Sequence, residues 1–336
     1  MKKNNQYLLQ INNLKTFFYT LDGIVRAVDG VSLVIKPGQT VGLVGESGCG
    51  KSVTAHSILR LLPLKISKIT EGEILFRRRD VKDTIDLVKV DPQGKIIRSI
   101  RGREIAMIFQ EPMTSLSPVY TVGNQIIETI LLHQQIEYNE AREHAIKMLE
   151  AVGLGMAESL IDEYPHRLSG GQRQRVMIAM ALSCNPSLLI ADEPTTALDV
   201  TIQAQIIELL KSLQKKFQMA VLIITHNLGV IAEIADEIAV MYLGRIVEKG
   251  SLQQVFKNPL HPYTIGLLKS VPMIGNQVKK KLAPIPGSVP DPLTAIEGCA
   301  FRLRCPICKQ HECKGQKEAP MLEVEPGHYV RCSLYD

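Results

Sequence analysis

A glycine-rich stretch, GESGCGKS, has the residue types and spacing of a phosphate-binding loop. It runs from Gly45 to Ser52 and fits the pattern G-x-x-x-x-G-K-[ST] at every fixed position. In such a loop the backbone N–H groups close around phosphate oxygens, the lysine reaches the β- and γ-phosphates, and the hydroxyl can ligate Mg²⁺. The apolar run TVGLVG precedes it and a helical pattern follows until Pro63, the context that separates the motif from a chance glycine-rich turn. We therefore predict a nucleoside triphosphate site with contacts from Gly45, Glu46, Ser47, Gly48, Cys49, Gly50, Lys51, Ser52 and Val53.

Two carboxylates follow a second apolar run, LLIADEP, which spans Leu188 to Pro194. Asp192 would stand at the carboxyl end of a strand and could hold Mg²⁺ through water, and Glu193 could polarise an attacking water molecule. Alone, such a pair is usually only a strand end. Together with the phosphate loop, it predicts a site that hydrolyses the nucleotide.

A second helix start, LSGGQRQR, also has the chemistry to meet an anion. Ser169 stands at a helix-capping position and two glycines follow it, so backbone N–H groups and the helix N-terminus would face a ligand. One nucleotide's phosphates already have a cradle in the first loop. We therefore predict that Ser169, Gly170, Gly171 and Gln172 serve a nucleotide bound elsewhere.

Five of the seven cysteines lie near the C-terminus, in a segment with little core-forming sequence. The N-terminus shows no secretion signal, so we expect reduced thiols, and a small irregular unit in that state needs a metal as its staple. Only Cys305 and Cys308 form the short pair that zinc sites usually show twice. The spacing leaves zinc, an iron–sulfur cluster and a metal-free segment open.

The bulk composition limits the classes of protein. A length of 336 residues suggests two domains, and 45% hydrophobic with 22% charged residues excludes disorder as the main state. The net charge of +5 does not choose between an anionic ligand, a membrane surface and nucleic acid. Val176 to Ala191, which is among the longest uncharged stretches, contains Asn185 and Pro186 and is too interrupted to predict a membrane span.

Periodicity indicates how these motifs are positioned. Residues 7–44 and 71–110 read as short strands with turns, and residues 122–152 read as helical. SLLIAD and AVLIIT read as buried strands separated by a segment of helical period, as βαβ construction requires. Prolines and a Lys279–Lys281 run appear after about residue 250. We predict an α/β fold with domains at 1–254 and 255–336.

Together with an ALD turn and the lone His226 after a strand, these motifs over residues 7–250 resemble an ABC-type ATPase. The resemblance implies a P-loop NTPase fold: a RecA-like core, an antiparallel β subdomain and a helical subdomain at about 115–165. It implies two such domains that sandwich two ATP molecules head to tail. It assigns Gln110 to Mg²⁺ and the attacking water, His226 to the γ-phosphate and Asp199 to coupling of the two sites. Phe18 is expected to stack on adenine, and Phe17 is the second choice. The alternative is that these rings pack in the core.

The stretches IRGREIAMIFQEPMTSLSP, HPYTIGLLKSVP, IPGSVPDP and GCAF…RC further resemble the ATP-binding subunits of oligopeptide/dipeptide importers. This second resemblance implies two membrane permeases, a paralogous ATPase and an external binding protein as partners, no nucleic acid, and a peripheral place on the cytoplasmic side of the inner membrane. It also implies a 4Fe–4S cluster on Cys299, Cys305, Cys313 and Cys332, with Cys308 as the alternative third ligand.

Two alternatives remain open at this stage. One is an ABC ATPase without permeases that acts in repair or regulation. The other is an importer of the same type that carries nickel or another small solute. A homodimer is also open beside the paralogous pair.

Overall fold

The computed structural model describes residues 7–79, 83–110, 115–196, 198–270, 285–294, 296–310 and 318–336. Backbone contacts divide the chain into two compact units. The first unit holds residues 1–9, 35–40 and 75–224, and the second holds residues 10–34, 41–74 and 225–336. Cys313 and Ala197 of the ALD turn lie outside the described residues.

Three parallel strands form the core of the first unit: β6 (Ile105–Ile108), β7 (Leu188–Asp192) and β8 (Ala220–Thr225). β7 lies between the other two, with Leu188 opposite both Ile105 and Ala220. Every residue of β7 and β8 is buried, as expected of parallel strands covered on both faces. The two apolar runs therefore form strands as predicted.

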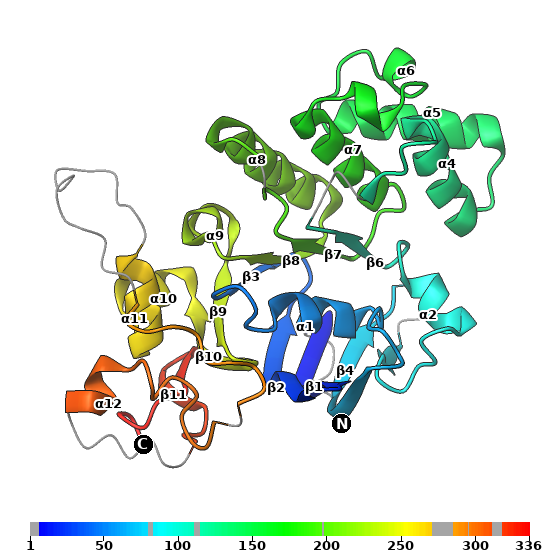
Figure 1. Cartoon of the computed structure of the whole chain (residues 1–336). Coiled ribbons are helices and arrows are strands. Elements are labelled where there is room, and N and C mark those ends of the chain that lie inside the picture. The colour runs from blue at the N-terminus through cyan, green and yellow to red at the C-terminus, as the bar shows by residue number, and fades with distance from the viewer. Residues whose placement is uncertain are drawn as a thin grey trace. The chain divides into compact units, whose positions relative to one another are not determined.

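Helices make up most of the rest of the first unit (Figure 1). α4 (Val122–His133), α5 (Tyr138–Ala151) and α7 (Gly170–Leu182) pack on one another, with the short α6 (Ala157–Leu160) against α5. The long α8 (Val200–Phe217) links β7 to β8. α2 (Lys95–Ile100) is a helix within the range predicted as strands, because Ile97 and Ile100 bury one face of this short helix.

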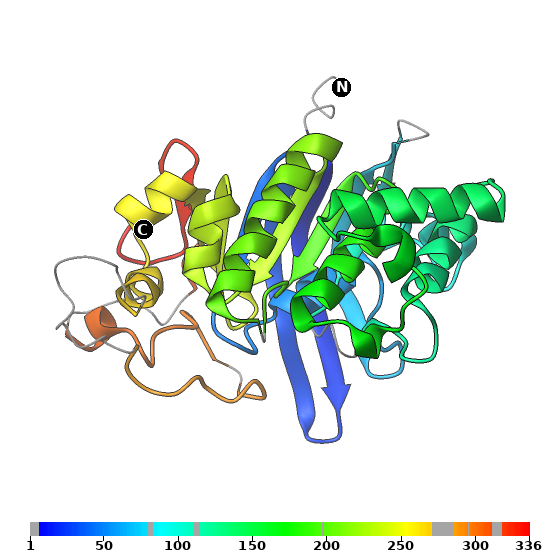
Figure 2. The same cartoon turned by 90° about the horizontal axis from the view of Figure 1, so that it is seen from above.

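The strands of the second unit belong to two sheets. β1 (Leu9–Thr20) lies between β2 (Gly23–Ile35) and β4 (Ser67–Arg77). The end of β4 passes into the first unit, where it pairs antiparallel with β5 (Thr84–Asp86). The long β1–β2 hairpin is clearest from above (Figure 2).

The other strands of the second unit follow the order β3, β9, β10, β12, β11. β3 (Thr40–Val44) is parallel to β9 (Glu237–Tyr242), and β9 to β11 are joined by antiparallel pairs. The ranges of the last three strands are Arg245–Ser251, His328–Val330 and Leu322–Glu325. The chain's final strands thus extend the sheet that carries the phosphate loop, and the domain boundary at 254/255 remains a prediction.

Five helices complete the description of the second unit: α1 (Lys51–Ile58), α9 (Leu228–Ile234), α10 (Leu252–Lys257), α11 (Pro262–Lys269) and α12 (Pro306–Gln310). α1 ends before the predicted stop at Pro63, since Arg60 takes a left-handed conformation with φ 56°. Within the described ranges, we find no helix with the length and hydropathy of a membrane span.

Candidate active site

The phosphate loop joins β3 to α1, and its shape depends on glycine. Gly50, which precedes α1, has φ 102°, and a Cβ atom there would lie 2.1 Å from the Ala27 carbonyl oxygen. A Cβ at Gly45 would lie 2.1 Å from the Met241 carbonyl oxygen. The loop backbone is therefore packed directly against neighbouring backbone. A residue with a Cβ atom would not fit at either position.

Lys51 lies over its own loop. Its Nζ donates to the carbonyl oxygens of Gly45 at 2.8 Å and Glu46 at 2.9 Å, and the side chain is buried. Burial raises the pKa of the Cys49 thiol, so this cysteine stays neutral and packs as a small apolar side chain. The loop thus presents one fixed cation and the N-terminus of an eight-residue helix, which together suit an anion.

His226 belongs to the same unit as the phosphate loop. It directly follows β8, and its side chain is exposed. Asn227, the next residue, caps α9 by accepting from the Gly229 N–H at 2.9 Å. His226 is therefore held between a buried strand end and a capped helix, where it can reach a ligand.

Gln110 and Glu193 meet in the first unit, and their roles in hydrolysis remain predictions. The Gln110 Nε2 donates to Glu193 Oε2 at 3.3 Å, and Thr196 Oγ1 donates to the same oxygen at 2.8 Å. Glu193 has φ 47°, and its N–H donates to the Ile224 carbonyl oxygen at 2.8 Å. A left-handed glutamate is uncommon and costs energy, so tertiary contacts hold this carboxylate at the end of β7. Asp192 is the last residue of β7 and is buried.

Two side chains that the sequence motifs did not single out support this carboxylate loop. Thr196 orients Glu193, and the buried Gln174 of α7 donates its Nε2 to the Pro194 carbonyl oxygen at 2.6 Å. Thr196 could have been found as a polar residue just after the strand. No sequence pattern marks Gln174, because its contact with Pro194 depends on how α7 packs.

The helix cap predicted at Ser169 forms at the start of α7, while its contact with an anion remains a prediction. Ser169 Oγ accepts from the Gln172 N–H at 3.3 Å, and Gln172 Oε1 accepts from the Ser169 N–H at 2.9 Å. This reciprocal capping box fixes the turn. A Cβ at Gly171 would lie 3.0 Å from Ile202 Cγ2 of α8. Ser169 itself is exposed, so its hydroxyl is available to a ligand.

Asp199 caps α8 in the same manner. Its Oδ1 accepts from the Ile202 N–H at 2.9 Å, and the side chain is exposed. This contact shows that Asp199 has a structural role as a helix cap. The role in coupling two nucleotide sites remains a prediction.

The aromatic pair on β1 is half-buried. The Phe17 ring lies 5.9 Å from the Arg26 guanidinium carbon, within the range of a cation–π contact. Phe18 follows it and points to the opposite face of the strand. Stacking of either ring on adenine remains a prediction.

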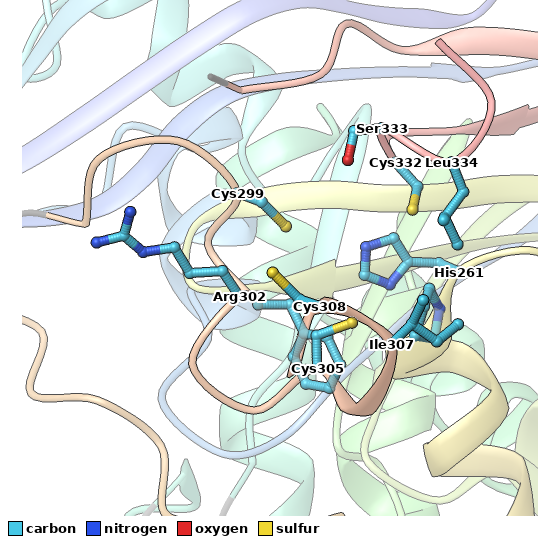
Figure 3. A pocket seen from close by; sticks show the side chains of 11 residues that line it. His261, Cys299, Arg302, Cys305, Ile307, Cys308, Cys332, Ser333 and Leu334 are labelled. Atoms are coloured by element: carbon cyan, nitrogen blue, oxygen red, sulfur yellow. The ribbon is translucent and has the colours of Figure 1, made fainter. Parts of the chain in front are cut away.

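Four of the C-terminal thiols line one pocket of the second unit (Figure 3): Cys299, Cys305, Cys308 and Cys332. His261 and Phe301 line it with them. All six described cysteines are free thiols. Over the residues that the structure covers, no three or more His, Cys, Asp or Glu side chains form a group that could hold a metal ion.

Comparisons with known proteins match both parts of the chain. Residues 28–196 match the family "ABC transporter", and residues 247–313 match "Oligopeptide/dipeptide transporter, C-terminal region". The chain is 50% identical to the oligopeptide transport ATP-binding protein AppD of Bacillus subtilis (strain 168), over 98% of this chain and 97% of that protein.

Two further comparisons agree with this. The dipeptide transport ATP-binding protein DppD of the same organism is 49% identical over 89% of this chain and 87% of its own length. Among solved structures, the dimeric, post-hydrolysis ATP-binding cassette MJ0796 bound to ADP and Pi is 30% identical, with a TM-score of 0.62, over 73% of this chain and 98% of that one.

Proposed function

We propose a mechanism from the premise that this chain belongs to the ABC transporter family of ATP-binding proteins. The family match and the 50% identity to an oligopeptide transport subunit establish that premise. The chain is an ATPase that powers peptide import, which confirms the function predicted from the sequence.

The geometry around Glu193 carries the proposal of how ATP is hydrolysed. Its carboxylate is buried and receives hydrogen bonds from Gln110 and Thr196 on one oxygen. Both donors fix the orientation of the group, so it can accept a proton from, or align, one water molecule. In the family's arrangement that water attacks the γ-phosphate of the ATP held by Lys51.

The oxygen donors present suit Mg²⁺. A buried carboxylate, Asp192, ends β7 and a hydroxyl, Ser52, lies in the first turn of α1, and Mg²⁺ prefers such hard oxygen ligands. When bound, the ion neutralises charge on the phosphates. Assignment of Asp192, Ser52 and Gln110 to one ion follows from the family motifs.

We further propose that the exposed turn at Ser169 binds the nucleotide of a second ATPase subunit. The hydroxyl and the first N–H groups of α7 are the donors. A paralogous chain is the favoured partner. Together the two subunits would drive two permeases from the cytoplasmic side of the membrane, with an external binding protein delivering peptide.

The iron–sulfur cluster implied by the family stays a proposal. Thiolates are the ligands that such clusters use, and four thiols line one pocket, but they do not form a ligating group as described. Cys299, Cys305 and Cys332, with Cys308 or Cys313, would hold the cluster. Anaerobic purification should yield about four irons and four sulfides per chain. One equivalent of zinc and no iron would refute the proposal.

Co-purification tests the transport role. Expressed with its permeases, the chain should form a stable membrane complex whose ATPase rate rises with the peptide-loaded binding protein. A complex that responds to nickel but not to peptides would change the cargo. Turnover stimulated by nucleic acid, without any permease complex, would contradict the importer assignment.

A further inference from the structure

Glu46 occupies a variable position of the phosphate loop, yet all of its polar groups are engaged. Its carbonyl oxygen accepts from Lys51 Nζ at 2.9 Å, within the loop. Its N–H donates to the Tyr263 hydroxyl at 2.9 Å. Its two carboxylate oxygens accept from Arg304 at 2.6 and 3.0 Å. Two elements of the C-terminal region therefore hold the loop through a single residue.

The Arg304 side chain is itself firmly placed. It is 4% exposed, against 28% for Glu46, and its Nε donates to the Pro286 carbonyl oxygen at 3.1 Å. The guanidinium lies over the rings of Tyr242 and Phe301. The hydrogen bond with Glu46 raises the pKa of Arg304 above its usual value, so the guanidinium stays charged. Such a bidentate, largely buried pair fixes the relative positions of its two side chains more firmly than a surface ion pair does.

Tyr263 reaches Glu46 from the same aromatic cluster. Its ring is buried and lies 4.7 Å from Tyr242 and 5.4 Å from Phe301, measured between ring centroids. Burial raises its pKa, so the phenol remains neutral and can accept from the Glu46 N–H. Phe301 also faces the thiol pocket. The cluster thus connects the segment from Cys299 to Arg304 to the phosphate loop by direct contact.

An acidic residue inside a loop that binds triphosphate is an electrostatic liability. An unpaired Glu46 carboxylate would repel the polyanion that the loop must hold. Arg304 neutralises it, and the two contacts from Arg304 and Tyr263 also keep the loop ordered before nucleotide arrives. Both effects favour binding, because less charge repulsion and less ordering entropy remain to be overcome.

We propose that Arg304 and Tyr263 are positioning residues for ATP binding, and that the segment from Cys299 to Arg304 sets the affinity of the phosphate loop through Glu46. The proposal rests on the proposed function, since it assumes that this loop binds ATP. It adds a structural link: a change that displaces the segment from Cys299 to Arg304 weakens ATP binding.

The test compares full-length variants for ATP affinity by titration calorimetry and for kcat and KM in the permease complex. Arg304→Gln should weaken ATP binding and raise KM roughly tenfold, with a much smaller effect on kcat, because Glu193 and its donors are untouched. Tyr263→Phe keeps the ring packing and loses one acceptor, so KM should rise by about fivefold. Arg304→Lys, which keeps the charge but not the fork, should fall between the parent and Arg304→Gln.

A matched control and a rescue separate positioning from stability. Arg78→Gln breaks a comparable buried pair with Glu104, at 2.6 Å, in the other unit. It should lower the melting temperature without changing KM. Adding Glu46→Gln to Arg304→Gln removes the carboxylate charge left unpaired by the first substitution, and it should restore most of the lost affinity.

Two outcomes would overturn the proposal. One is a fall in melting temperature for Arg304→Gln with KM unchanged. The other is a double variant that binds ATP as weakly as Arg304→Gln alone. If the parent chain itself binds no ATP, the proposed function fails instead, and the two failures are distinguishable.

Discussion

Replacing Ser169 by alanine separates the structural role of this residue from its proposed contact with a partner's nucleotide. The side chain caps α7, and losing such a cap costs about 1 kcal/mol of stability. For a chain of this length, that corresponds to a fall in melting temperature of about 1–2 °C. If the hydroxyl also donates to a phosphate oxygen, the lost charge-assisted bond adds about 1.5–3 kcal/mol to the activation barrier. ATP turnover should then fall roughly ten- to hundredfold.

The chain contains its own control for this experiment. Ser251 caps α10 with the same capping box: its Oγ accepts from the Gln254 N–H at 3.3 Å, and its N–H donates to Gln254 Oε1 at 3.0 Å. The corresponding distances at Ser169 are 3.3 and 2.9 Å. Ser251→Ala should therefore cost similar stability, while its ATPase rate stays near that of the parent.

The assay measures thermal unfolding and steady-state ATPase activity for both variants in the assembled transporter. Binding of ATP to the isolated Ser169→Ala chain should persist, since that chain's own phosphate loop is intact. ATP-dependent association with the partner subunit should weaken. Equal loss of activity in the two serine variants would show that the turn acts only as a helix cap, and the head-to-tail arrangement would be refuted.

Three further predictions follow from the same geometry. Glu193→Gln should keep ATP binding but lower turnover by about 10²–10⁴-fold, the range of a lost general base, and parental turnover would exclude Glu193 from that role. Burial lowers the pKa of His261 to about 3, whereas in the unfolded chain this imidazole becomes protonated as the pH falls below about 6.5. The free energy of unfolding should therefore fall by about 2 kcal/mol from pH 7 to pH 5 relative to His261→Asn, which keeps a capping side chain, and identical pH profiles in urea melts would contradict this. Gly123→Ala should destabilise by about 1–3 kcal/mol, since its Cβ would lie 2.4 Å from Ile161 Cγ1, and an unchanged denaturation midpoint would show that α4 can shift.

The locally encoded elements were the most predictable. The strand–loop–helix around Lys51 and the cap at Ser169 depend on contacts between residues a few positions apart, so the motif and its geometry coincide. The stop of α1 was less well predicted. Pro63 marked the latest possible end, but the left-handed Arg60 ends the helix earlier.

The amino-acid sequence by itself determined the chemistry of this protein: a phosphate loop, paired carboxylates after an apolar strand, and a second capped turn. These features need only short spacings and intrinsic backbone preferences. Tertiary structure alone decided that Gln110 meets Glu193 across 83 positions and that Arg304 meets Glu46 across 258. No local pattern encodes such pairs, because burial of apolar side chains and strand pairing bring distant segments together, and only the packed chain fixes which polar groups then face one another.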